Sequence, residues 1–205
     1  MVLMRVMVST VPDGGAFLAA CRAVPLGRAG MVGRSWCFLA PVSRRRSGCV
    51  ALARIGGVDD VGWMRLAVSL AWQCPPSRTA FSVGAVVVDA DGVELSRGFS
   101  REGGDLSLHA EEAALGKVSP GEPRLAGATI YSTLEPCSQR RSRPHTCTEL
   151  IIAAGLRRVV LAWREPALFV ADCQGAELLT RAGIEVTELT ECAADAAAPN
   201  RHLVG

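Results

Sequence analysis

Two cysteines and a histidine are spaced so that they could bind one metal ion. Cys137 follows Pro136, Cys147 comes ten positions later, and His109 lies upstream of both. In catalytic sites Zn²⁺ takes three protein ligands, with histidine nitrogen and cysteine thiolate among the preferred donors, and its fourth position stays open for water. We therefore predict a zinc site formed by His109, Cys137 and Cys147.

Glu111, two residues after His109, is the candidate for proton transfer at this site. A bound metal ion lowers the pKa of water enough to give a nucleophile near neutral pH, and a carboxylate must then carry the proton onward. If a helix begins near His109, the two side chains lie about 200° apart around its axis but can still reach one cleft from the first turn. A second helix beginning at Glu135-Pro136 would provide free backbone N–H groups that favour the Cys137 thiolate.

Each motif has a simpler interpretation when it is taken alone. A His-x-Glu triplet occurs by chance in many proteins, and a Pro-Cys pair is more often a buried thiol at a turn than a metal ligand. Here, however, both motifs follow loops, appear in the expected order, and the second is preceded by a strand. The combination therefore favours a catalytic site.

The elements that must position these residues follow from the hydrophobic periodicity. Helices are predicted over residues 60–73, 109–115, 149–154 and 175–182, and strands over residues 81–88, 93–100, 128–133, 158–163 and 184–189. Strands that alternate with helices of this length imply a mixed five-stranded sheet covered by helices in one α/β domain, over residues 60–190. The flanking segments are predicted to be an irregular basic N-terminal extension over residues 1–59 and a frayed C-terminal tail over residues 191–205.

The charged residues are unevenly distributed along the chain. The first 62 residues contain eight arginines and three aspartates, a formal charge of +5, whereas the remainder carries −3. A protein that binds nucleic acid without sequence preference usually has a basic domain rather than a basic extension. We therefore expect no nucleic-acid partner.

Composition suits a cytoplasmic globular protein. Hydrophobic residues make up 49% of the sequence, but no stretch approaches the roughly 18 consecutive apolar residues that span a bilayer, so no membrane contact is expected. The remaining cysteines follow no repeating pattern, and we interpret them as buried or incidental thiols rather than a disulfide framework. These are Cys21, Cys37, Cys49, Cys74, Cys173 and Cys192.

The combined pattern resembles the zinc-dependent cytidine/deoxycytidylate deaminase superfamily, whose signature is His-x-Glu followed by Pro-Cys-x-x-Cys. The likeness is greatest to the pyrimidine deaminase domain of the riboflavin pathway, and it covers roughly residues 64–189. The matching residues are His109-Ala110-Glu111, Thr133 to Ser138, Ala153-Ala154-Gly155, Arg158-Val159-Val160 and Ala182-Gly183-Ile184. Two features differ, because Thr79-Ala80-Phe81 stands where those domains usually carry Pro-Asn-Pro, and the interval from Cys137 to Cys147 is longer.

This resemblance implies a cytidine-deaminase-like three-layer α-β-α sandwich with Zn²⁺ as cofactor. It also implies hydrolytic removal of an exocyclic amine from a pyrimidine or aminopyrimidine nucleotide, with the diaminohydroxyphosphoribosylaminopyrimidine deaminase step of riboflavin biosynthesis as a candidate. Glu111 would then pass a proton to the ring nitrogen and on to the departing ammonia. Relatives of this kind often form dimers or tetramers, so a homo-oligomer is expected.

Substrate contacts and alternative functions follow from the loop before Cys147. Arg141 and Arg143 are predicted to bind phosphate, because planar guanidinium groups hold it bidentately, although a solvated basic loop is an equal alternative. Ser132 is expected to line the pocket.

Two other functions remain open: a dCMP/cytidine-type or other nucleobase deaminase, and a non-catalytic zinc-binding interaction module in which His145 would complete a closed site as fourth ligand.

Overall fold

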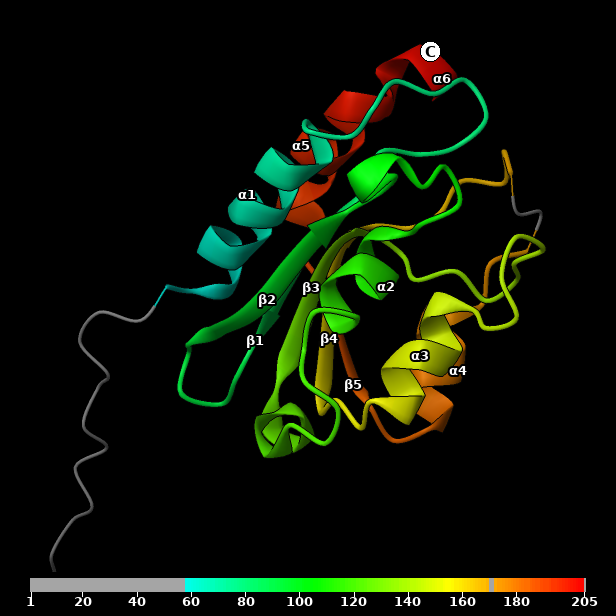
Figure 1. Cartoon of the computed structure of the whole chain (residues 1–205). Helices are drawn as coiled ribbons and strands as arrows, with labels where there is room; N and C mark the ends of the chain where they lie inside the picture. Colours follow the sequence, from blue (N-terminus) through cyan, green and yellow to red (C-terminus); the bar gives the residue numbers. More distant parts are fainter. Residues whose placement is uncertain (1–57, 170–171, 205) are drawn as a thin grey trace, which may run out of the picture. The chain divides into compact units, whose positions relative to one another are not determined.

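A five-stranded mixed sheet forms the centre of the domain (Figure 1). The computed structural model describes residues 58–169 and 172–204, so nearly all of the predicted N-terminal extension, residues 1–59, lies outside the described residues. The strands are β1 (Gly84–Val88), β2 (Glu94–Phe99), β3 (Thr129–Leu134), β4 (Arg158–Trp163) and β5 (Glu185–Glu188). Their order is β2-β1-β3-β4-β5, with β1 antiparallel to β2 and β3, and β3, β4 and β5 parallel.

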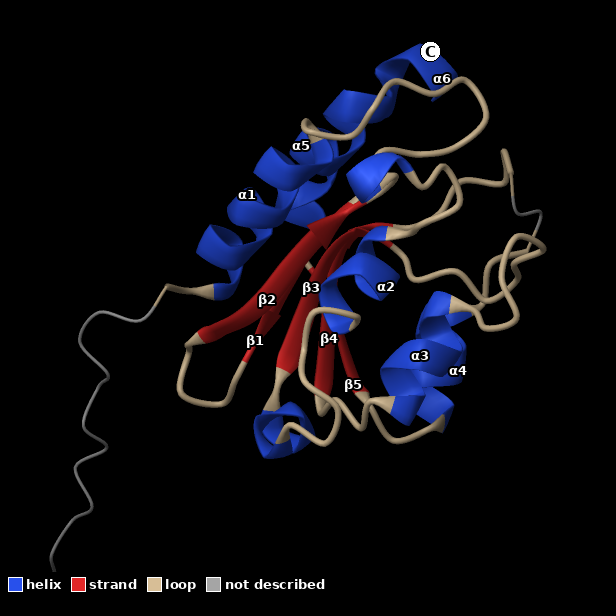
Figure 2. Ribbon diagram, in the orientation of Figure 1, coloured by secondary structure: helices blue, strands red, loops and turns tan. Residues whose placement is uncertain are grey.

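Helices cover both faces of this sheet (Figure 2). One face carries α1 and α5, and the other carries α2, α3 and α4. The helices are α1 (Asp60–Ala71), α2 (Ala110–Leu115), α3 (Cys147–Ala153), α4 (Gly175–Arg181), α5 (Ala193–Ala197) and α6 (Arg201–Val204). The predicted three-layer sandwich is therefore confirmed. Within the described residues, no helix is both long and apolar enough to cross a bilayer.

Side-chain alternation along the strands divides the core into two clusters. Val87, Ile130 and Val159 pack with the apolar residues of α2 and α3, while Val86 and Val160 pack with those of α1. Successive residues of a strand point to opposite faces, so a strand covered on both sides is apolar throughout. This is why all five residues of β1 are buried, and why β1 appears in the sequence as a continuous apolar run.

The predicted helix start at Glu135-Pro136 is wrong. The chain from Glu135 to Thr146 contains no helix, and the next helix begins at Cys147. Thr146 caps this helix, and Glu149 completes a capping box by accepting the Thr146 N–H at 2.8 Å. The Glu135 carboxylate instead binds distant backbone groups. The missed signal was Thr-x-x-Glu directly before an apolar run, which is the pattern of a capping box.

The predicted frayed tail over residues 191–205 is also wrong for the part that the structure describes. The chain continues through short helical segments to Val204, and Cys192, Ala196 and Asn200 are buried. Cys192 and Ala196 belong to the core cluster on the α1 face of the sheet. An alanine-rich segment shows little hydrophobic periodicity, so this helix could not be recognised from the sequence pattern. Its small side chains nevertheless pack closely against α1 and the sheet, and this packing between residues far apart in the sequence stabilises the segment.

Asn200 joins this segment to the chain just before β1. The Ser82 N–H donates to Asn200 Oδ1 at 2.7 Å, and Asn200 Nδ2 donates to the Ser82 carbonyl at 3.0 Å. Both residues are buried, so the amide satisfies two backbone groups that water does not reach. The side chain thus replaces the hydrogen bonds that a neighbouring strand would make.

We expect Asn200→Ala to lower the free energy of unfolding by about 2–3 kcal/mol, because it leaves a buried N–H and a buried carbonyl unpaired. Urea denaturation measures the difference. His202→Ala is the matched control, since its ring nitrogen also contacts a backbone carbonyl, that of Ser77 at 2.8 Å, but at an exposed position. Equal urea midpoints for the two variants would show that the Asn200 contact contributes no special stability.

Candidate metal and active site

His109, Cys137 and Cys147 come together at one end of the sheet. His109 directly precedes α2, Cys137 lies in the loop after β3, and Cys147 is the first residue of α3. Their ligand atoms all lie within 4.8 Å of one another. The structure therefore brings together the three residues that the sequence analysis proposed as ligands.

The distances between these atoms fit a tetrahedral zinc site. His109 Nδ1 lies 3.7 Å from Cys137 Sγ and 3.4 Å from Cys147 Sγ. With Zn–S of about 2.3 Å and Zn–N of about 2.0–2.1 Å, a tetrahedral arrangement places nitrogen and sulfur about 3.6 Å apart. The donor set and its spacing both suit Zn²⁺.

The surroundings of Cys137 favour its thiolate. The Cys147 thiol donates to the Cys137 sulfur and, together with the neighbouring His109, lowers the pKa of the Cys137 thiol well below its usual range despite burial. The Cys147 N–H, at the first residue of α3, also donates to Cys137 Sγ at 3.4 Å. A helix start therefore does provide the predicted N–H group, but from α3 rather than from a helix at Cys137.

A closed structural zinc site finds no support among the described residues. His145, the proposed fourth ligand, has an exposed side chain, and its Nδ1 lies 3.8 Å from a carboxylate oxygen of Glu149. Among the described residues, the side chains that could hold a metal ion are those of His109, Cys137 and Cys147, and His145 does not belong to this group. A site with three protein ligands keeps a position open for water, as catalytic zinc sites do.

Glu111 lies beside this group, in the first turn of α2, and its side chain is buried. Ser132 Oγ donates to Glu111 Oε1 at 2.8 Å and fixes the carboxylate. Burial raises the pKa of Glu111. Ser132 itself is fully buried and does not line the cavity, so the predicted substrate contact is corrected to a residue that orients Glu111.

A cavity of about 310 Å³ opens next to these residues. His109, Glu111 and Cys137 line it. An aromatic wall is formed by Phe81 and Phe169, whose ring centroids lie 4.9 Å apart. Such a cavity has the size of a small-molecule site, with an apolar wall and a few convergent polar groups.

The two predicted phosphate-binding arginines lie in different environments. Arg141 lines the cavity, is exposed, and makes no hydrogen bond or ion pair with a described residue. Arg143 does not line the cavity, and its guanidinium forms ion pairs with Asp105 and with Glu112, the latter at 3.5 Å. Arg141 is therefore available to a ligand, whereas Arg143 is held by carboxylates.

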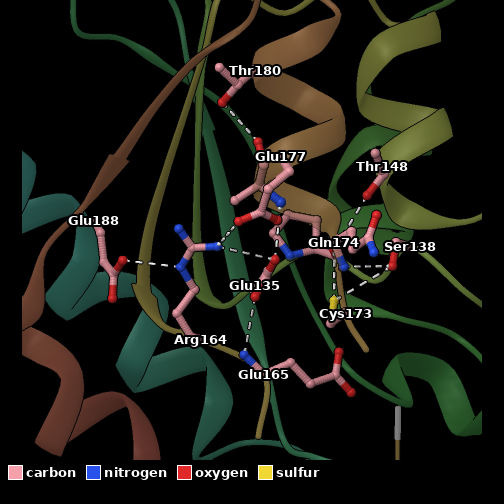
Figure 3. Close-up of polar contacts among 12 residues, drawn as sticks. Glu135, Ser138, Thr148, Arg164, Glu165, Cys173, Gln174, Glu177, Thr180 and Glu188 are labelled. Carbon is pink, nitrogen blue, oxygen red and sulfur yellow. Dashed lines mark hydrogen bonds and ion pairs between the residues drawn. The ribbon is translucent and has the colours of Figure 1, made fainter. Parts of the chain in front are cut away.

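The Cys137 loop, residues 135–146, is hydrogen-bonded to the start of α4 by contacts that were not predicted from the sequence (Figure 3). The buried Glu135 carboxylate accepts the Ala176 N–H at 3.0 Å and the Glu165 N–H at 3.4 Å. Ser138 Oγ accepts the Gln174 N–H at 2.9 Å. A glutamate directly before Pro-Cys, after an apolar strand, was the available signal, because a buried carboxylate needs several donors.

Glu165 lines the same cavity, and burial raises the pKa of its carboxyl from the ordinary 4.5 to about 7. A raised folded-state pKa stabilises the fold at low pH, and this stability is lost as pH rises from about 4.5 through 7. We expect Glu165→Gln to remove this loss and to stabilise the protein at pH 8 by about 1–2 kcal/mol relative to wild type, because solvent screens a carboxyl that is only partly buried. Thermal unfolding at pH 5 and pH 8 measures it. Equal changes in Tm between pH 5 and pH 8 in wild type and Glu165→Gln would show that the Glu165 pKa is not raised.

The family model for the cytidine and deoxycytidylate deaminase zinc-binding region matches residues 58–163, more than half of the chain. The chain therefore belongs to the cytidine and deoxycytidylate deaminase family, which confirms the family predicted from the sequence. The matched region also supports zinc as the cofactor, because it contains the His109, Cys137 and Cys147 group.

The similar proteins include a pyrimidine deaminase and a riboflavin biosynthesis protein. The chain is 44% identical over 128 residues to the diaminohydroxyphosphoribosylamino-pyrimidine deaminase of Schizosaccharomyces pombe. It is 41% identical over 131 residues to the riboflavin biosynthesis protein RibD of Aquifex aeolicus. Both alignments cover 62% of this chain, but only 31% and 34% of the relatives. The chain thus spans about a third of the length of these relatives.

Solved structures give the same fold. RibD from Acinetobacter baumannii superposes with a TM-score of 0.58 and 32% identity, covering 71% of this chain and 39% of that chain. The Rib2 deaminase of Aspergillus oryzae superposes with a TM-score of 0.55 and 26% identity, covering 71% of this chain and 96% of that chain. The cytidine-deaminase-like architecture predicted from the sequence is therefore confirmed.

Proposed function

We propose that this protein is a zinc-dependent deaminase that removes the exocyclic amine of an aminopyrimidine nucleotide, as in the diaminohydroxyphosphoribosylaminopyrimidine deaminase step of riboflavin biosynthesis. The observation that carries this proposal is the convergence of His109, Cys137 and Cys147 beside the buried carboxylate of Glu111, next to a cavity that His109, Glu111 and Cys137 line. His109, Cys137 and Cys147 would hold the zinc ion. When bound, zinc lowers the pKa of water so that it can act as a nucleophile near neutral pH.

The protein's own residues would move the protons of the reaction. Glu111 takes a proton from the attacking water and gives it to the ring nitrogen next to the amine-bearing carbon. It then passes the second proton of that water to the amine, the C–N bond breaks, and ammonia leaves while a carbonyl forms on the ring. Ser132 holds Oε1 of Glu111 throughout, which leaves the other carboxylate oxygen for the transfers.

The substrate proposal rests on the named relatives and on one cation. The Schizosaccharomyces pombe relative is named as a diaminohydroxyphosphoribosylamino-pyrimidine deaminase, and the Aquifex aeolicus relative is named as a riboflavin biosynthesis protein. Arg141 lines the cavity and has no hydrogen-bond or ion-pair partner in the part of the chain that the structure describes, so it can bind the phosphate of such a nucleotide. A dCMP-type deaminase is the second candidate, because the matched family model covers deoxycytidylate deaminases as well.

An ammonia-release screen of the zinc-loaded protein distinguishes these substrates. The panel contains diaminohydroxyphosphoribosylaminopyrimidine, dCMP, deoxycytidine and cytosine. We expect the highest kcat/KM for the first compound, and dCMP as the best substrate would favour the second candidate. No ammonia from any of the four would overturn the proposed activity.

Three further features remain proposals. We extend the deaminase domain from the predicted boundary at residue 190 to residue 204, because buried Asn200 binds the segment before β1. Homo-oligomerisation stays a prediction, which light scattering of the purified protein would measure. The cytoplasmic location likewise stays a prediction.

A further inference from the structure

Arg140 combines deep burial with an unused hydrogen-bond donor. Its side chain is only 2% exposed, yet it lines the cavity. Its Nη1 has no hydrogen-bond partner among residues 58–169 and 172–204, which the structure describes. A buried donor without an acceptor costs about 1–3 kcal/mol, and more when the group is charged, so an acceptor from outside the protein is to be expected at this atom.

The rest of the guanidinium is held firmly. Nη2 donates to Glu112 Oε2 at 2.8 Å and to the carbonyl of Ser107, and Nε donates to Ser142 Oγ at 3.1 Å. These bonds fix the plane of the group. The direction of the two Nη1 hydrogens is therefore set before any ligand arrives, as recognition of a ligand atom requires.

The other arginines at the cavity differ from Arg140. In Arg101, Nε, Nη1 and Nη2 each donate to a protein oxygen, and these are the carbonyls of Pro75 and Phe81 and the hydroxyl of Ser82. Arg141 is exposed, so water can satisfy its donors. Arg140 is thus the buried cavity arginine, among the described residues, that has a free donor.

The charges and the position of Arg140 indicate which oxygen it binds. Arg140 and Arg143 both pair with Glu112, and Arg143 also pairs with Asp105, so two cations face two carboxylates. This balance suits a neutral acceptor better than a phosphate. Nη2 also contacts the carbonyl of Ser107, two residues before His109, which places the guanidinium near the metal ligands.

We propose that Arg140 Nη1 donates to a carbonyl oxygen of the pyrimidine ring and so selects substrates that carry such an oxygen. This inference rests on the proposed deaminase function, because it places the ring beside His109 and Glu111. Arg141 would then contact the phosphate, and the two neighbouring arginines would recognise different ends of the nucleotide.

Equilibrium binding tests this role separately from turnover. The zinc-loaded Glu111→Gln protein serves as background, and the probes are diaminohydroxyphosphoribosylaminopyrimidine with its dephosphorylated riboside, and dCMP with deoxycytidine. We expect Arg140→Gln to weaken calorimetric Kd about 10- to 100-fold for both members of the tighter-binding pair, as for loss of a charged hydrogen bond. Arg140→Lys should not restore affinity, because the shorter ammonium keeps the charge but not the fixed Nη1 donor.

Arg143→Gln is the matched control. This substitution removes the other cation that pairs with Glu112, and Arg143 does not line the cavity. The Kd should therefore stay within about twofold of that of the background protein. Zinc content and Tm of each variant show whether the site is still folded, and Arg140→Lys supplies the comparison if Arg140→Gln has lost zinc.

Three results would overturn the inference. The first is an unchanged Kd in Arg140→Gln. The second is a loss seen with the phosphorylated probes but not with the phosphate-free ones, which would make Arg140 a phosphate contact. The third is no binding of any probe to the Glu111→Gln protein. A different result concerns the reaction only: wild-type protein releases no ammonia, while Arg140→Gln still weakens the binding of both the phosphorylated and the phosphate-free probe. That result would overturn the proposed deaminase activity but not the role of Arg140.

Discussion

Replacing Glu111 with Gln is expected to lower kcat about 10²- to 10⁴-fold and to leave the zinc content unchanged. Glutamine has nearly the same shape, and its amide oxygen can still accept the hydrogen bond from Ser132 Oγ. It cannot take a proton from water at neutral pH. The ligand atoms of the proposed zinc site are untouched, so metal analysis should give the same stoichiometry as wild type.

Two further variants make this prediction specific. Ser132→Ala should keep zinc and lose about tenfold in kcat, because the carboxylate remains but is no longer fixed. Glu149→Gln changes a carboxylate outside the cavity and should have nearly wild-type kcat. Ammonia release by Glu111→Gln at more than a tenth of the wild-type rate would show that another group transfers the proton.

Gly175→Ala is expected to disrupt the site through packing alone. A Cβ atom at residue 175 would lie 1.9 Å from the carbonyl oxygen of Pro136, which is backbone and cannot rotate away. Either α4 or the Cys137 loop must move. We expect a loss of about 3 kcal/mol in the free energy of unfolding, together with weaker zinc binding, because Cys137 directly follows Pro136.

Gly116→Ala is the control for this substitution. Gly116 caps α2 in a right-handed conformation, with φ −64°. Of the described residues, its new Cβ would approach only the Glu112 carbonyl, at 3.0 Å. Urea denaturation and competition with a chromophoric zinc chelator measure the two effects. Wild-type zinc affinity in Gly175→Ala would show that the contact between α4 and Pro136 does not position Cys137.

Local pattern predicted most of the fold, since the strands and their helices bury regular faces. All five strands were located, because β-branched runs such as Val86-Val87-Val88 are bounded by turns. The two errors concern segments stabilised by residues far away in sequence. Glu135 binds Ala176 rather than capping a helix, and Asn200 binds Ser82 across 118 positions. Neither contact leaves a periodic signal.

The site was predicted unevenly for a similar reason. His109, Glu111, Cys137 and Cys147 could be proposed from residue type and spacing, because metal binding needs a few definite donors. The residues of the cavity wall could not be predicted in this way, because they depend on which arginines of one loop form ion pairs with carboxylates. The run Arg140-Arg141-Ser142-Arg143 gives no indication that Arg140 is buried and Arg141 exposed.

The bond between Asn200 and Ser82 has a consequence for the order in which the molecule is completed. Phe81, which forms part of the cavity wall, directly precedes Ser82. Contacts between residues so far apart in the chain form late, because closing a long loop costs entropy that only the later packing recovers. During synthesis, the sheet and the proposed ligands can all emerge before Asn200. The wall that faces the substrate would therefore reach its final form last, after the metal ligands are already in place.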